Sequence, residues 1–156
     1  MSVCSRWLWF GLVALLTAAA PDARADERPI KVTVIAILAS EKNTKIDKEL
    51  KALAVELKKK YPEFKGFVLE RTACESMKIG EKKSFQVFDK SEVVVELKDK
   101  NDKDNKVTLT ITPPTLGDVT YTTCCGKFFP VTTGETTKSG ERLIVAVMVK
   151  PCDGKK

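Results

Sequence analysis

The sequence predicts an α+β fold: one amphipathic helix packed on a mainly antiparallel, curled or sandwich-like β-sheet, after a cleaved signal peptide. Three observations lead to this prediction. After the first 25 residues, only one segment has the apolar spacing typical of a helix. Ile30–Ala39 becomes continuously apolar toward its end, and Leu143–Val149 is apolar throughout, so these two segments lack a polar face. Most segments between them alternate apolar and polar residues. A strand without a polar face must be covered on both sides.

The first 25 residues have the organisation of a secretory signal. A basic start with Arg6 precedes an uncharged run from Trp7 to Ala20, and Ala23–Ala25 supplies the small-x-small pattern that precedes cleavage. This run is shorter than the roughly 20 residues that a transmembrane helix needs. We therefore expect an exported chain, periplasmic or extracellular, with one α+β domain over residues 26–156 and no stable membrane span after cleavage.

The first strand and the helix come next along the chain. Ile30–Ala39 alternates at first and is continuously apolar from Val34, which places it near the centre of a sheet. A Thr44-Lys-Ile-Asp47 box is predicted to open the helix, and Pro62 to end it. The apolar stripe of this helix consists of Ile46, Leu50, Leu53, Ala54, Leu57 and Tyr61.

Four shorter strands are predicted after the helix. They lie at Phe67–Thr72, Ser84–Phe88, Val93–Leu97 and Val107–Thr112. The last two alternate strictly and flank a polar turn, which predicts a hairpin. Their polar neighbours, such as Thr110, are expected to face solvent and to tolerate a charge.

The C-terminal part contains three further predicted strands and one loop. Val119–Cys125 and Lys127–Val131 are predicted to pair around Gly126, and Thr132–Gly140 to form a mobile polar loop. Leu143–Val149 is the second strand without a polar face. Because one helix can cover only one face of a sheet, we expect the first and last strands near the centre, the helix on one side and a β layer on the other.

The cysteines predict a disulfide framework. Cys4 leaves with the signal, and the even number that remains in an exported chain predicts two disulfides. Adjacent strand residues point to opposite faces, so Cys124 and Cys125 are each expected to reach a different partner, Cys74 or Cys152. The alternative is a redox or soft-metal site at Cys124-Cys125-Gly126, although the Cys-x-x-Cys spacing of redox proteins is absent.

Enzyme chemistry has little support in the sequence. The chain has no histidine, which excludes triads that use one and removes the commonest general base and zinc ligand. Glu70 and Glu75 flank a strand end but lack an apolar context that would raise a carboxyl pKa. Asp99–Asn105 lacks the glycine and the ligand positions of an EF-hand loop. We therefore predict no catalytic, cofactor-binding or metal-ligating residue, and no cofactor.

The charge pattern argues against a nucleic-acid partner. The net charge is +6, and lysine supplies 22 of the 27 basic residues. Most lysines alternate with acidic residues, which is typical of a solvated surface rather than of a nucleic-acid interface.

Together these observations predict a small exported binding domain that is not an enzyme. Its expected contact surface is a sheet edge with the flanking 132–140 loop, and its partner is an unidentified protein or a second copy. A helix on an antiparallel sheet, a signal peptide and four cysteines also resemble the broad cystatin-type architecture of protease inhibitors. Gln86-Val-Phe-Asp-Lys90 departs from that family's Gln-x-Val-x-Gly loop, so no inhibitory residue is carried over. A thiol redox protein using Cys124 and Cys125 is the enzymatic alternative.

Overall fold

The computed structural model describes residues 28–101 and 103–151. The predicted signal peptide, residues 1–25, and Cys152 lie outside the described residues. Within the described ranges, neither helical segment has the length and apolar character that crossing a membrane requires.

Eight strands and one α-helix make up the described chain. A short 3-10 turn, η1 (Lys48–Leu50), runs directly into the helix α1 (Lys51–Lys60). The strands are β1 (Ile30–Ser40), β2 (Gly66–Met77), β3 (Lys82–Phe88), β4 (Ser91–Asn101), β5 (Lys106–Thr112), β6 (Val119–Cys124), β7 (Phe128–Thr136) and β8 (Arg142–Pro151).

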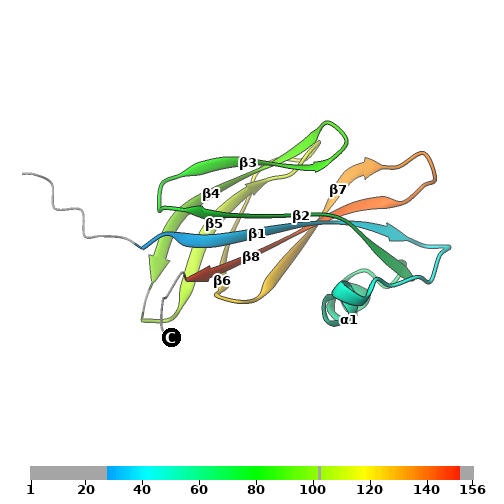
Figure 1. The fold of residues 1–156 in the computed structure, drawn as a ribbon, viewed down its shortest axis with the longest axis horizontal. Coiled ribbons are helices and arrows are strands. Elements are labelled where there is room, and N and C mark those ends of the chain that lie inside the picture. Colours follow the sequence, from blue (N-terminus) through cyan, green and yellow to red (C-terminus); the bar gives the residue numbers. More distant parts are fainter. Residues whose placement is uncertain (1–27, 102, 152–156) are drawn as a thin grey trace, which may run out of the picture.

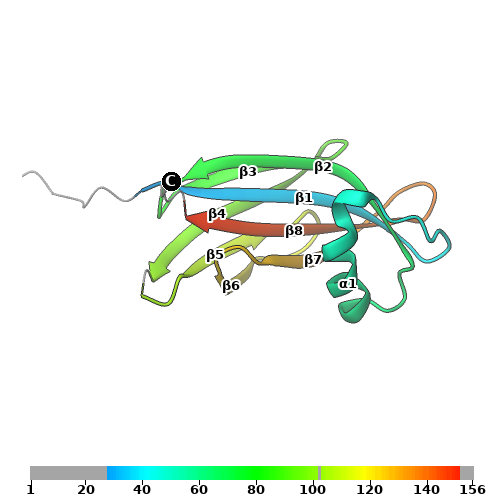
Figure 2. The same cartoon turned by 60° about the horizontal axis from the view of Figure 1, so that its bottom comes forward.

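The strands form two antiparallel sheets that face each other in a sandwich (Figure 1). Sheet A has the order β2-β1-β8-β7, and sheet B the order β3-β4-β5-β6. Helix α1 packs on the outer face of sheet A, toward one end of it (Figure 2). The fold is therefore mostly antiparallel β with one short helix, which fits the predicted α+β class.

The two apolar strands lie where the sequence predicts them, side by side in the middle of sheet A. Ile30 pairs with Pro151 and Ala39 with Arg142 at the two ends of their ladder. One face of this pair packs against sheet B and the other packs under α1. The register between β1 and β2 shifts at Ala36 and Ile37, where Glu70 of β2 is the extra residue. On β1, the side chains of Ile35, Ile37 and Ala39 pack on the helix side of the sheet.

The predicted helical stripe is confirmed for Leu50, Leu53, Ala54 and Leu57, which are buried against sheet A, whereas Ile46 precedes the helical segments and forms a bridge with Phe67. The predicted opening of the helix is wrong. Asp47 stands at the N-cap of η1 but makes no side-chain capping bond there. Its Oδ2 instead accepts a hydrogen bond from the main-chain N–H of Leu69 in β2, at 2.9 Å.

The predicted pairing around Gly126 is also wrong. β6 pairs with β5 in sheet B, whereas β7 pairs with β8 in sheet A. Gly126 has a φ of 86°, and its N–H donates to the carbonyl of Val149 at 2.8 Å. This residue therefore forms a corner that carries the chain from one sheet to the other.

The predicted loop at 132–140 is mostly a strand. β7 continues to Thr136, with a bulge between Thr132 and Thr136, and only a short turn remains before β8. The bulge places Thr133 in a buried site where its hydroxyl donates to the Leu143 carbonyl at 3.0 Å. The polar composition of this segment predicted that its side chains would be exposed. Thr133 can be buried because its hydroxyl makes a hydrogen bond.

The centrality of β1 and β8 can be tested with a buried charge. Ile37→Asp and Val147→Asp place a carboxylate at positions that are 0% exposed, and each should lower the free energy of unfolding by more than about 3 kcal/mol. Urea unfolding followed by circular dichroism measures this loss. The matched control is Val55→Asp on α1, where the side chain is 57% exposed and little change is expected.

Thr110 is not a suitable control for that experiment. The sequence predicts a solvent-facing side chain there, but Thr110 is only 7% exposed and bonds the hydroxyl of Thr120 at 2.6 Å. Wild-type stability in the Ile37 or Val147 variant would contradict the central placement of these strands.

Candidate binding surfaces

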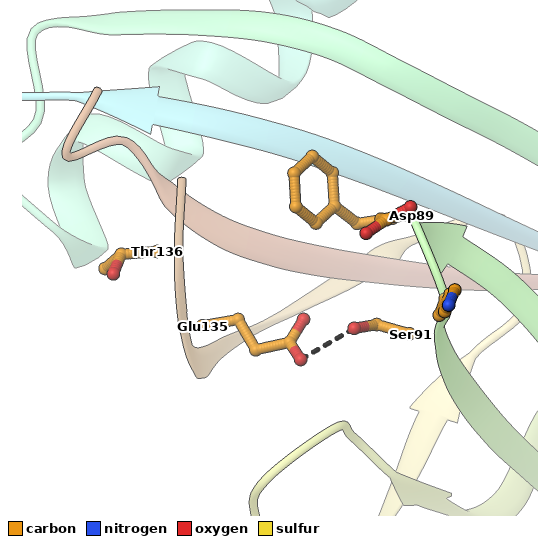
Figure 3. A pocket seen from close by; sticks show the side chains of 6 residues that line it. Asp89, Ser91, Glu135 and Thr136 are labelled. Atoms are coloured by element: carbon orange, nitrogen blue, oxygen red, sulfur yellow. Dashed lines mark hydrogen bonds between the residues drawn. The ribbon is translucent and has the colours of Figure 1, made fainter. Parts of the chain in front are cut away.

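A hollow of about 260 Å³ lies at one end of the sandwich, where the β3–β4 turn meets β7 (Figure 3). Asp89 in this turn has a left-handed φ of 44°, and its carbonyl accepts a hydrogen bond from the Gln86 side chain. The hollow is lined by Phe88, Asp89, Lys90, Ser91, Glu135 and Thr136.

Ser91 and Glu135 connect the two sheets across this hollow. The Ser91 hydroxyl on β4 donates to Oε1 of Glu135 on β7 at 2.6 Å (Figure 3). The other oxygen, Oε2, is buried and has no hydrogen-bond partner among the described residues. A serine paired with a carboxylate but with no histidine lacks the usual activating base, so this contact is suited to joining the sheets rather than to nucleophilic catalysis.

Sheet edges are the other places where a chain can bind, because an edge strand presents unpaired main-chain groups. The β2 edge is occupied near both ends. The N–H groups of Phe67 and Leu69 donate to the Lys45 carbonyl and the Asp47 carboxylate, and Lys83 donates to the Ser76 carbonyl. The middle of β2 carries the charged residues Glu70, Arg71 and Glu75 and a register shift against β1, which also discourage pairing.

The β7 and β3 edges contain residues and irregularities that discourage pairing with a further strand. Pro130 in β7 has no N–H, and its carbonyl accepts from the Lys60 ammonium of α1 at 2.7 Å. β7 also contains the bulge described above. β3 carries Lys82 and Lys83 and has its own irregularity between Gln86 and Phe88.

The β6 edge differs from the other three. Its sequence, Val-Thr-Tyr-Thr-Thr-Cys, has no charge and no proline, and its ladder with β5 has no register shift. The N–H of Cys125 donates to the Asn105 carbonyl, which continues the same register. Since bonded and non-bonded pairs alternate in an antiparallel ladder, Tyr121 is bonded to β5, and the main-chain groups of Thr120 and Thr122 point outward.

An aromatic stack lies on the inner side of β6. The rings of Tyr121 and Phe129 are stacked with centroids 3.7 Å apart, and the Lys60 ammonium lies 4.8 Å from the Phe129 centroid. The Tyr121 hydroxyl is buried without a hydrogen-bond partner among the described residues, and burial raises the pKa of this phenol above its usual value. The stack fills the space between β6 and β7, which are not hydrogen-bonded to each other.

Paired threonines cover the outer side of β5 and β6. The hydroxyls of Thr108 and Thr122 lie 2.8 Å apart, and those of Thr110 and Thr120 lie 2.6 Å apart. Cross-strand pairs of this kind stabilise a sheet. They also give β6 a flat, uncharged outer surface.

The cysteines do not form the predicted link from Cys74. Cys74 on β2 and Cys124 at the end of β6 are exposed free thiols, on edge strands of different sheets. The Sγ atom of Cys74 instead lies 3.4 Å from the hydroxyl oxygen of Thr33. Cys125 packs against the core between the sheets, whereas Cys124 is exposed. The predicted bond to Cys152 falls on a residue outside the described ranges.

The remaining sequence candidates are engaged in surface contacts. Glu75 accepts a hydrogen bond from Lys83 at 3.0 Å, and this contact is the main cause that raises the pKa of Lys83. Gln86 accepts from the Arg71 guanidinium at 2.8 Å. In the part of the chain that the structure describes, no group of three or more His, Cys, Asp or Glu side chains is placed to hold a metal ion.

Comparisons of the chain with protein-family models, with curated proteins and with solved structures find no match. Function must therefore be argued from the surfaces of the chain itself. Sequence reasoning missed the Ser91–Glu135 contact because the two residues are 44 positions apart and lie on different sheets. The contact surface predicted from the sequence, a sheet edge with the flanking 132–140 segment, stays a prediction, and that segment lies mostly in β7.

The contact between the sheets can be tested with Ser91→Ala. This change leaves both oxygens of the Glu135 carboxylate without a protein partner, and we expect a loss of about 1–3 kcal/mol in the free energy of unfolding. The matched control is Ser84→Ala, which removes an exposed hydroxyl contact with Glu92 and should cost less than about 0.5 kcal/mol. Equal urea midpoints for the two variants would show that the contact with Glu135 does not stabilise the fold.

The buried phenol predicts a dependence of stability on alkaline pH. Because folding raises the pKa of Tyr121, the unfolded chain loses this proton first, from about pH 10, and stability falls as the pH rises further. Tyr121→Phe should remove this contribution, and at pH 7 it should match or exceed wild type by up to about 1 kcal/mol. Urea midpoints at pH 7 and above pH 10 measure both effects. Tyr61→Phe, which removes a 3.4 Å contact to the Pro130 carbonyl, is the control and should not be stabilising.

Proposed function

We propose that the protein is an exported, non-enzymatic domain that binds another polypeptide by adding a strand at the open edge of β6. The observation that carries this proposal is the contrast between β6 and the other three edges. Lysines, a proline, bulges or capping contacts protect β2, β3 and β7, whereas β6 combines uncharged residues with outward main-chain groups at Thr120 and Thr122. Strand addition uses such groups for affinity and the adjacent side chains for specificity.

The inner part of the molecule supports binding rather than catalysis. The space between the sheets is filled by apolar side chains, including Val95, Leu109 and Val145, which are all 0% exposed. A substrate would therefore have to bind on the outside. The chain has no histidine, and its hollow at Ser91 and Glu135 offers hydrogen-bond acceptors without an activating base.

The two alternatives draw less support from the described residues. A redox protein would use Cys124 and Cys125, but Cys124 is exposed while Cys125 packs against the core, so the pair does not present two thiols on one surface. A cystatin-type inhibitor would need a free loop at Gln86–Lys90. There Gln86 is held by Arg71 and by the turn at Asp89.

A pair of lysine variants tests the edge. Thr122→Lys places a charge on β6, and Thr108→Lys places the same charge on the inner strand β5 while breaking the same hydroxyl contact. Affinity capture from envelope or culture fractions, under reductant, should recover the same polypeptides with wild type and Thr108→Lys but not with Thr122→Lys. Capture that is indifferent to Thr122→Lys, or turnover by the wild-type protein in hydrolase and disulfide-reductase assays, would contradict the proposal.

A further inference from the structure

We infer that the polypeptide that pairs with β6 is β6 of a second copy of this chain, antiparallel to the first and related to it by a two-fold axis beside Tyr121. The inference rests on the proposed function, since it uses the same edge, and it adds the identity of the partner and the register. β6 lies at the margin of sheet B, so this pairing would join two copies of sheet B into one continuous sheet (Figure 2). A two-fold interface of this kind is closed and stops at the dimer.

The main-chain pattern of β6 fits a two-fold axis at this position. Thr120 and Thr122 carry the outward N–H and C=O groups, and they stand symmetrically on either side of Tyr121. Antiparallel pairing centred on Tyr121 places Thr120 opposite Thr122 of the second copy, and Thr122 opposite Thr120. Each of these two pairs can exchange two N–H···O=C bonds, so four main-chain bonds form with no change in the β5–β6 ladder.

The side chains of the same register are compatible with each other. On the outer face, the contacts Thr110–Thr120 and Thr108–Thr122 would continue into the threonines of the second copy as unbroken rows. Threonine pairs across strands are favourable. On the inner face, the two Tyr121 rings become neighbours above the Phe129 rings on which they already stack.

Charge favours a second copy in this orientation. The whole chain is basic, yet β6 is uncharged, so self-pairing brings no like charges together along the strand. Asp118 precedes β6, while Lys106 is paired with Cys124 at its other end. Antiparallel pairing places Cys124 of the second copy opposite Asp118, and therefore brings Lys106 of that copy to the same end of the interface. Opposite charges therefore lie at both ends of the interface, with β6 of one copy between them.

Light scattering after size exclusion, over a range of protein concentrations and under reductant, tests this inference. The reductant is needed because Cys124 is an exposed thiol at the end of β6. We expect a concentration-dependent dimer for wild type and for Thr108→Lys. We expect at least a tenfold weaker dimer for Thr122→Lys, because it places two lysines as diagonal neighbours on the same face across the two-fold axis. A wild-type protein that is monomeric throughout, or a dimer unaffected by Thr122→Lys, would overturn the inference.

Amide exchange of the wild-type protein gives a second measurement that does not depend on a variant folding. The N–H groups of Thr120 and Thr122 should become protected as the concentration rises, while that of Lys138 in the β7–β8 turn should not change. Exchange at Thr120 and Thr122 that is independent of concentration would overturn the inference. If wild type is monomeric while the capture experiment still separates Thr122→Lys from Thr108→Lys, self-pairing is wrong and binding of a different polypeptide stands. If capture also fails to separate them, both proposals are wrong.

Discussion

The structure depends on one constraint: two strands without a polar face lie side by side in one sheet. β1 and β8 are hydrogen-bonded over almost their whole length, and together they require a cover on each side. Sheet B provides the cover on one side, and the three buried residues of α1 together with Leu50 of η1 provide it on part of the other. The corner at Gly126 and the capping of the β7 edge by Lys60 follow from the need to place these covers.

The sequence predicts those parts of the fold that depend on the local spacing of apolar residues. The continuous apolar run at Val34–Ala39 and the stripe through Leu50 and Leu57 are visible without any partner, because burial on two faces or on one helical side leaves a local pattern. Which sheet a strand joins leaves no such local pattern. Whether the chain turns back at Gly126 or crosses to the other sheet depends on β8, which needs an edge neighbour and lies later in the sequence.

The same distinction explains the outcome for the candidate surfaces. A lone Pro130 or an uncharged Val119–Cys124 run can be read from the sequence, but their meaning depends on which strands become edges. Asp47 looks like a helix cap until Leu69 is placed beside it. Thr110 looks solvent-facing until Thr120 is added on the neighbouring strand. Polar side chains are misjudged most often because a distant partner can satisfy them and allow burial.

The pairing of β1 with β8 affects the order in which the chain folds. Within each sheet the paired strands are consecutive in the sequence, except that β1 also pairs with β8, so that Ile30 meets Pro151. During synthesis β1 therefore has one unpaired edge until β8 has been made. Contacts between distant parts of a chain form slowly. The native sheet is thus completed only after β8 has been made.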